Sequence, residues 1–198
     1  MKTVNILLYE GVDEMDFCGP LETLASCRVV ADGKWTDKPV FLVETVGARA
    51  GSIHCAHGLT VIPDKQVTQA READIVIVPG GPGARKPGFP TVLLEFLART
   101  SLTTELVASV STGAFLVAKT GIADGRRLAT HYALAAELAR QYPAVQVVQG
   151  QRVVADGKDL ISSAGISAGV DLALAVAERY AGRQSARMTA RRLEWPGG

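Results

Sequence analysis

The sequence predicts a single α/β domain in which a mostly parallel β-sheet is covered by helices on both faces, giving a three-layer sandwich. Short β-branched runs alternate with amphipathic stretches, and neither a repeat nor a linker rich in Pro, Gly or Ser divides the 198 residues. With 47% hydrophobic residues, a chain of this length can bury one substantial core. We therefore expect residues 1–198 to form one domain.

The sheet is expected from apolar runs of strand length that are rich in β-branched residues. These runs are Val4 to Tyr9, Val40 to Val46, Asp74 to Val78, Glu105 to Val110, and a late pair, Arg152 to Ala155 with Leu160 to Ser163. Asp156-Gly157 lies within the late pair and is a dipeptide typical of tight hairpin turns, in which both central residues must tolerate φ > 0. The sheet should therefore include one antiparallel hairpin.

Helices are expected where apolar residues recur at helical spacing. The first, Leu21 to Cys27, is opened by Pro20 at a first-turn position, where a missing N–H costs nothing. The others are Val92 to Ala98, Ala114 to Lys119, Ala133 to Gln141, Ala168 to Tyr180 and Ser185 to Arg192.

Composition and charge favour a soluble, cytoplasmic protein that acts on a small molecule. The formal net charge of +1 gives no general attraction to nucleic acid or anionic lipid. The N-terminal apolar run, Val4 to Leu8, is too short for a signal segment or a membrane span. Three cysteines, an odd number without paired spacing, argue against a disulfide framework and for a reducing compartment.

The first candidate for chemistry is Ser111, which stands between the apolar run Glu105 to Val110 and a helical stretch. This is the layout of a nucleophile elbow, whose neighbours two positions either side must be small, as Ser109 and Gly113 are. N–H groups at the start of the helix would stabilise a developing oxyanion. The alternative is that Ser111 is a helix N-cap, a common role for serine.

The second candidate is the loop at Gly80-Gly81, which follows a buried strand. In an open α/β sheet, ligands bind beyond the carboxyl ends of the strands, the same edge that would display Ser111. The backbone N–H of Gly81 is expected to pair with that of Thr112 as an oxyanion hole. The loop lacks the spacing of a phosphate-binding motif, and the alternative is a plain turn.

Asp16 is flanked by apolar residues next to a predicted helix. If it is buried beside the elbow, desolvation would raise its pKa and suit it to proton transfer. Its alternative role is helix N-capping. Cys18 lies two residues further on and is expected to be a packed small side chain rather than a reactive thiol.

Histidines offer one further candidate and a weak metal signal. His131 follows the extended run Leu128 to Thr130 and is placed to orient on the elbow. His54 and His57 fall in a predicted hairpin loop, in a segment too compact for a tetrahedral metal site without distant ligands. We therefore expect neither a metal nor another cofactor.

Taken together, five collinear motifs resemble the ThiJ/PfpI superfamily, in particular the branch that contains isonitrile hydratases and the sensor domains of AraC-type regulators. The motifs are Met15 to Pro20, Val78 to Gly81, Ala108 to Ala114, Ala129 to Tyr132, and Ser163 to Asp171. The resemblance covers most of the chain and implies a flavodoxin-like, glutamine-amidotransferase-like single domain.

The resemblance also implies residue roles. In isonitrile hydratases the elbow cysteine adds to the isocyanide carbon, and an aspartate handles protons, giving an N-substituted formamide. Carried over by position, Asp16 is the acid/base, and Thr112 and Gly81 supply backbone donors. Ser111 occupies the place of the nucleophile, and Gly80 and Cys18 lie among the substrate-binding positions. The implied partner is an isocyanide, and the implied assembly is a homodimer.

Serine at position 111 departs from the pattern, because a hydroxyl is almost wholly protonated at neutral pH whereas an elbow cysteine can be a thiolate. Two explanations stay open: a cysteine-to-serine variant made to trap a substrate complex, and a natural member that binds without turnover. The intact surroundings favour the first.

A small-molecule sensor domain is the main alternative to an enzyme, favoured by Ser111 and by the tail Ala190 to Gly198, where a regulator would continue into DNA-binding helices. A protease-like or glyoxalase-like member is a third possibility. Asp16 stands against it, because many of those relatives carry glutamate there. The chain contains no helix-turn-helix pattern, so direct DNA binding is not expected.

Overall fold

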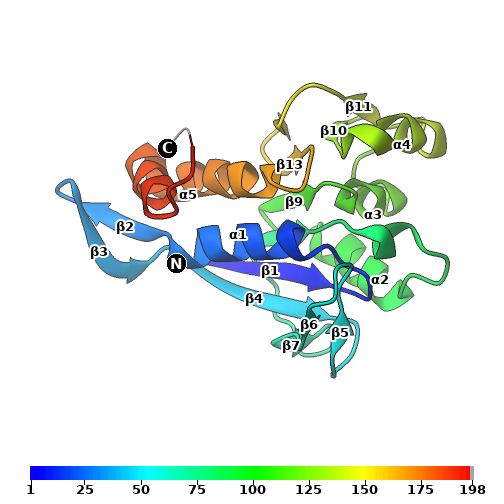
Figure 1. Ribbon diagram of the computed structural model, residues 1–198, viewed down its shortest axis with the longest axis horizontal. Coiled ribbons are helices and arrows are strands. Elements are labelled where there is room, and N and C mark those ends of the chain that lie inside the picture. Colours follow the sequence, from blue (N-terminus) through cyan, green and yellow to red (C-terminus); the bar gives the residue numbers. More distant parts are fainter. Residues whose placement is uncertain (197–198) are drawn as a thin grey trace.

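The computed structural model describes residues 1–196; positions 197 and 198, the last of the predicted domain, lie outside the described residues. Figure 1 shows a central sheet with helices around it. Its seven strands are, in spatial order, β12 (Val153–Asp156), β13 (Leu160–Ser163), β9 (Leu106–Val110), β8 (Ile75–Val78), β1 (Lys2–Leu8), β4 (Phe41–Gly47) and β7 (Lys65–Gln66). Every neighbouring pair is parallel except β12 with β13. The predicted α/β class with one antiparallel excursion is confirmed.

Helices cover both faces of the sheet because the connections on either side of β1 run in opposite directions along the sheet. The helices are α1 (Glu14–Ser26), α2 (Thr91–Thr100), α3 (Gly113–Lys119), α4 (Ala135–Gln141) and α5 (Ala168–Arg192), with short 3-10 turns η1 (Pro82–Arg85) and η2 (Tyr132–Leu134). The chain crosses through α1 from β1 to β4, whereas α2 leads away from β1, from β8 to β9. Right-handed crossovers in opposite directions place their helices on opposite faces. α1 packs against α5 (Figure 1).

The strand order reverses between β1 and β8, and this position determines where a ligand can bind. β1 pairs with β4 on one side and with β8 on the other. Every residue of β8, β9 and β13 is buried, as expected for parallel strands covered on both faces. The segments that follow β1, β8 and β9 therefore meet beyond one edge of the sheet, where such folds hold their ligands.

Three small two-stranded sheets lie beside the main sheet; the sequence predicted a hairpin loop at the second of them and an extended run in the third. They are β2 (Arg28–Ala31) with β3 (Lys34–Pro39), β5 (Ile53–His54) with β6 (Thr60–Val61), and β10 (Arg127–Ala129) with β11 (Gln146–Val148). They are short, and β3 in particular is polar and largely exposed, so the periodicity that marks a half-buried strand is absent.

The predicted start of the first helix at Pro20 is wrong. α1 begins at Glu14, with the Asp13 side chain accepting the Met15 N–H as the N-cap, and Pro20 lies inside the helix. Because Pro20 has no N–H, the helix loses one hydrogen bond there. Close packing offsets the loss: a Cβ added at Gly169 of α5 would lie 3.4 Å from Pro20 Cγ.

Two other boundaries show how local chemistry shapes the chain. The helix pair expected at the C-terminal end is confirmed: α5 is interrupted at Gly182, whose φ of 83° and ψ of 161° are not helical. The predicted hairpin exists, but Asp156 pairs with Leu160 as part of the strand, and within the turn only Gly157 has positive φ.

No helix within residues 1–196 is both long and apolar enough to cross a membrane.

Candidate functional site

Ser111 follows β9 in a backbone conformation that non-glycine residues rarely adopt, with φ of 54°. Two hydrogen bonds hold it there: its N–H donates to the Ser163 carbonyl at 3.0 Å, and its carbonyl accepts from Thr130 Oγ1 at 2.9 Å. Strand and helix approach so closely that a Cβ added at Gly113 would lie 2.0 Å from the Val78 carbonyl oxygen. These features are those of a nucleophile elbow.

The strained elbow leads to a stability prediction. A left-handed backbone costs a non-glycine residue about 1–2 kcal/mol, so Ser111→Gly should raise the free energy of unfolding by about 1 kcal/mol. Ser111→Ala keeps the strain and should leave stability nearly unchanged, since Ser111 Oγ makes no hydrogen bond within residues 1–196. Urea unfolding of both variants provides the measurement. A glycine variant no more stable than the alanine variant would contradict strain at the elbow.

A cavity of about 180 Å³ opens beside the elbow and is large enough for a small molecule only. It brings together four of the predicted site residues, Gly81, Ser111, Thr112 and His131. The remaining lining residues were not predicted; they are Asp13, Pro82, Arg85, Leu134 and Ile166.

Asp16 does not line this cavity; it is fully buried on α1. Its Oδ2 accepts the Gly80 N–H at 2.9 Å, while its Oδ1 has no hydrogen-bond partner in the described chain. Burial raises the pKa of the Asp16 carboxyl to about 7; the nearby Asp13 carboxylate adds to the rise, and the Gly80 N–H opposes it. The expected N-cap alternative for Asp16 is wrong, because Asp13 fills that role. A carboxyl with this pKa can give or take a proton at neutral pH.

Gly80 joins Asp16 to the elbow. A Cβ added at Gly80 would lie 2.5 Å from both the N and Oγ1 of Thr112 and 2.7 Å from Asp16 Oδ2. Only glycine fits at this position, and the absence of a side chain lets the carboxyl and Thr112 lie within a few ångströms of each other. Asp16, Gly80 and the elbow thus form one contiguous site, as the motif order suggests.

The predicted oxyanion hole differs from the arrangement observed. The Gly81 N–H donates to Thr112 Oγ1 at 2.8 Å and is therefore not free for a ligand. The Thr112 backbone N–H, by contrast, donates to no acceptor within residues 1–196. Thr112 is consequently the backbone donor next to Ser111, and its side chain fixes the glycine loop.

His131 lines the cavity but makes no hydrogen bond to Ser111 in the described chain. Its Nδ1 accepts the Ala133 N–H at 3.4 Å, and its ring stacks against Tyr132 with centroids 4.7 Å apart. No side chain in the described part of the protein hydrogen-bonds to Ser111 Oγ. The site thus lacks the paired base that activates a serine hydroxyl.

Cys18 is not brought to the cavity. It lies half-buried on α1, on the side of Glu14 and Cys55, and burial raises the pKa of its thiol. A thiol with a raised pKa is mostly protonated at neutral pH and is a weak nucleophile. The expectation that Cys18 is a packed side chain therefore describes it better than the substrate-binding role implied by the resemblance.

One group of potential metal ligands, Asp13, Glu14 and His57, lies near the site. Glu14 accepts hydrogen bonds from the His57 N–H at 2.8 Å and the Leu59 N–H at 3.2 Å, and its Oε2 lies 3.1 Å from His57 Nδ1. The hydrogen bond to Glu14 raises the pKa of the exposed His57 imidazole. These contacts tie the β5–β6 hairpin to α1, so each of the three side chains already has a structural partner.

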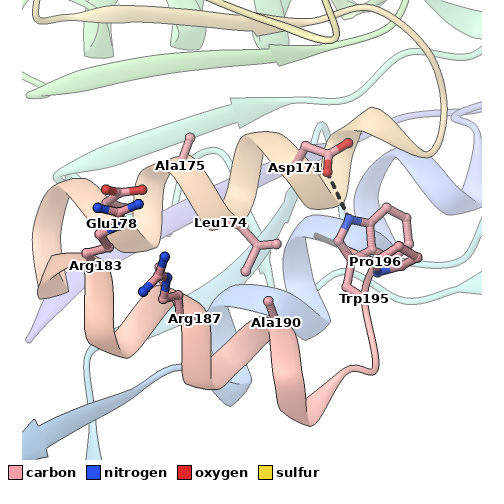
Figure 2. Close-up of a pocket in the computed structure, with 10 residues that line it drawn as sticks. Asp171, Leu174, Ala175, Glu178, Arg183, Arg187, Ala190, Trp195 and Pro196 are labelled. Atoms are coloured by element: carbon pink, nitrogen blue, oxygen red, sulfur yellow. Dashed lines mark hydrogen bonds between the residues drawn. The ribbon is translucent and has the colours of Figure 1, made fainter. Parts of the chain in front are cut away.

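A larger hollow, of about 320 Å³, lies away from the elbow between the two halves of α5 (Figure 2). Trp195 closes one end of it, with its indole N–H donating to Asp171 Oδ1 at 2.8 Å. Arg152 holds the other oxygen of Asp171. This network docks the end of the chain onto the first half of α5 and includes none of the predicted site residues.

Comparison with known proteins identifies the fold and its relatives. The model of the DJ-1/PfpI family matches residues 2–179. An isonitrile hydratase from Pseudomonas putida is 29% identical over 97% of this chain and 78% of its own length. The transcriptional regulator CdhR from Pseudomonas aeruginosa is 26% identical over 91% of this chain, which spans about half of that regulator.

Solved structures agree with the family assignment at the level of the fold. A ThiJ/PfpI family protein from Pseudomonas syringae superimposes with a TM-score of 0.82 at 21% identity, over 100% of this chain and 76% of that one. The structural similarity of this chain to solved DJ-1/PfpI proteins confirms the predicted flavodoxin-like architecture. The match to the family model over most of the sequence is decisive: this chain belongs to the DJ-1/PfpI family.

Proposed function

We propose that the site binds a small isocyanide and is built for its hydration to an N-substituted formamide, with serine at position 111 holding turnover at a low level. The observation that carries the proposal is the buried Asp16 carboxyl, whose pKa of about 7 matches neutral proton transfer, next to the strained elbow. The similarity to an isonitrile hydratase over 97% of the chain supports the same chemistry.

The reaction balances as addition of water to the isocyanide carbon. The elbow nucleophile forms a bond to the terminal carbon, and that carbon takes a proton, giving an imidate or thioimidate on the enzyme. Water then adds across the C=N bond, its oxygen bonding to the carbon and one of its protons going to the nitrogen. The bond to the elbow residue breaks, the elbow atom takes back the other water proton, and the N-substituted formamide leaves. In this proposal the Thr112 N–H stabilises the negative charge that develops on addition, and Asp16 is the group that exchanges protons.

A sensor domain is the second candidate, and Ser111 is the observation that favours it. A hydroxyl with no hydrogen-bonded base is a poor nucleophile, whereas binding needs only the shape and polarity of the cavity. The similarity to CdhR supports this function, and this chain spans about half of that regulator. The predicted homodimer and cytoplasmic location stay predictions under both candidates.

Binding of a short alkyl isocyanide to the Ser111 chain tests the shared part of both candidates. We expect saturable one-to-one binding in calorimetry, and an isocyanide stretching band in the infrared that is shifted from its position in water. Ile166 lines the cavity and is 38% exposed, so Ile166→Trp should fill the entrance and abolish binding.

Leu102→Trp is the matched control, because Leu102 is 84% exposed and does not line the cavity. It should bind as the parent does. Binding that survives Ile166→Trp would place the ligand elsewhere and remove the basis of the proposal. Persistence of the bound isocyanide band distinguishes a binding protein from an enzyme.

A further inference from the structure

Arg85 brings a positive charge to the cavity, from the short turn that follows the glycine loop. η1 runs directly on from Gly81, and its last residue, Arg85, lines the same cavity as Ser111 and Thr112. The Arg85 side chain is only 33% exposed. A partly buried guanidinium beside a reactive centre is a natural partner for a planar anion.

Packing positions Arg85, while its hydrogen-bond donors stay uncommitted. Its guanidinium carbon lies 5.9 Å from the centroid of the Phe115 ring, and Nη1 lies 3.6 Å from Glu137 Oε2. That separation is too long for a hydrogen bond, and Glu137 Oε1 is already occupied by Gln141 Nε2 at 2.9 Å. Within residues 1–196 the Arg85 side chain makes no hydrogen bond.

Other arginines of this chain that form ion pairs are used differently. Arg126 donates to both Asp156 and Asp159, and Arg152 donates to Asp171. Those guanidinium groups have structural partners that account for their position. Arg85 is 33% exposed, between Arg126 at 22% and Arg152 at 59%, and differs from both in making no hydrogen bond, which leaves its N–H groups available to a ligand.

The rest of the cavity limits what that ligand is. Leu134, Ile166 and Pro82 supply apolar walls. Asp13, the acidic residue in the lining, has its Oδ1 committed to the Met15 N–H and its Oδ2 at 3.8 Å from His57 Nδ1. Arg85, by comparison, has an ion-pair partner in Glu137 at 3.6 Å but makes no hydrogen bond within residues 1–196, so its N–H groups are open to a ligand.

We infer that Arg85 is a specificity-determining residue that binds a carboxylate on the substrate, so that the preferred substrates are small isocyanides bearing a carboxylate on a short aliphatic chain. The isocyano group in this inference rests on the proposed function. The carboxylate is inferred from Arg85 alone. The carboxylate accepts a bidentate pair of hydrogen bonds from the guanidinium, while the aliphatic chain contacts the apolar walls.

Calorimetry on the Ser111 chain tests the carboxylate with two probes of similar size, 3-isocyanopropionate and its methyl ester. We expect the carboxylate to bind roughly tenfold to a hundredfold more tightly, the range for hydrogen bonds to a charged group. Arg85→Gln should remove this preference by weakening carboxylate binding far more than ester binding, and Arg85→Lys should restore part of it. Equal affinity for both probes in the parent would overturn the inference, as would an equal loss for both in Arg85→Gln.

Arg99→Gln is the matched control, because Arg99 also lies over a phenylalanine ring, that of Phe96 at 5.6 Å, but is not in the cavity lining. It should retain the full preference, and a comparable loss in Arg99→Gln would overturn the assignment to Arg85. Formamide formation by a Ser111→Cys variant is measured separately. If the carboxylate preference depends on Arg85 but no formamide forms, the carboxylate site is retained and the hydratase function is refuted. If formamide forms without the preference, the hydratase function is retained and the carboxylate site is refuted.

Discussion

Ser111→Cys is expected to give this chain isocyanide hydration at a rate about 10²–10⁴-fold above that of the Ser111 chain, the range typical of gaining an activated reacting group. The reason lies in the acidity of the two side chains. An elbow can lower the pKa of a thiol into the neutral range, but a hydroxyl stays protonated. No side chain of the described residues is hydrogen-bonded to Ser111 Oγ to take its proton.

The backbone geometry is already suited to cysteine. Serine and cysteine have the same branching, and the main-chain hydrogen bonds that fix position 111 come from Ser163 and Thr130 rather than from its own side chain. Formation of formamide, followed through loss of the isocyanide stretch, provides the assay. The variant should also show a thiol that titrates below the ordinary cysteine pKa of about 8.5.

Ser111→Ala is the control for this experiment, because it has neither hydroxyl nor thiol and should match the slow parent. A cysteine variant that folds, carries a low-pKa thiol and still leaves alkyl and carboxylate isocyanides intact would argue for the sensor reading. Rapid turnover by the Ser111 chain itself would show that a base reaches the hydroxyl, with His131 the first residue to test.

Asp16→Asn is expected to lower turnover of the Ser111→Cys protein by about 10²–10⁴-fold, the usual loss when a general acid or base is removed. The asparagine oxygen can still accept the Gly80 N–H that Asp16 Oδ2 accepts at 2.9 Å, so the fold should persist. What is lost is the exchangeable proton beside the elbow. Single-turnover measurement of formamide distinguishes this loss from weaker binding.

The same substitution has a pH signature in stability. The Asp16 pKa is about 7 in the folded chain against an ordinary 3.8, so between these values the native state holds a proton that the unfolded state has released. Stability from this group is therefore fully present below pH 3.8 and falls as pH rises toward 7. The stability of Asp16→Asn relative to its parent should therefore rise across this interval, by up to about 4 kcal/mol.

Asp74→Asn provides a control of opposite sign. The Thr3 N–H, at 2.7 Å from Asp74 Oδ2, is the main cause that holds the pKa of Asp74 below its usual range, with Lys2 adding to it. Its contribution is present above the ordinary pKa and is lost as pH falls, so Asp74→Asn should be less stable than its parent at neutral pH. Urea unfolding of both variants from about pH 3 to pH 8, a range that reaches below the ordinary pKa of Asp74, gives the comparison. Parallel curves for Asp16→Asn and its parent would contradict the raised pKa.

The sequence by itself determined the features that depend on neighbours in the chain. The runs that became β8, β9 and β13 are apolar and β-branched because both faces of each strand are covered. The elbow at Ser111 was predictable because small residues must flank a turn in which strand and helix nearly touch. The observed 2.0 Å between a Cβ at Gly113 and the Val78 oxygen gives the reason.

The tertiary structure alone decided the features that depend on distant partners. Asp16 could be a cap or an acid, and its pKa is raised by burial, with the Asp13 carboxylate adding to the rise, which only the folded chain brings about. Pro20 lies inside α1 because α5 packs against it. The Gly81 N–H is taken by Thr112, and Arg85, which local sequence cannot distinguish from a solvated surface charge, lines the elbow cavity. Burial, pKa and donor availability arise when segments far apart in the chain come together, so the local pattern does not contain them.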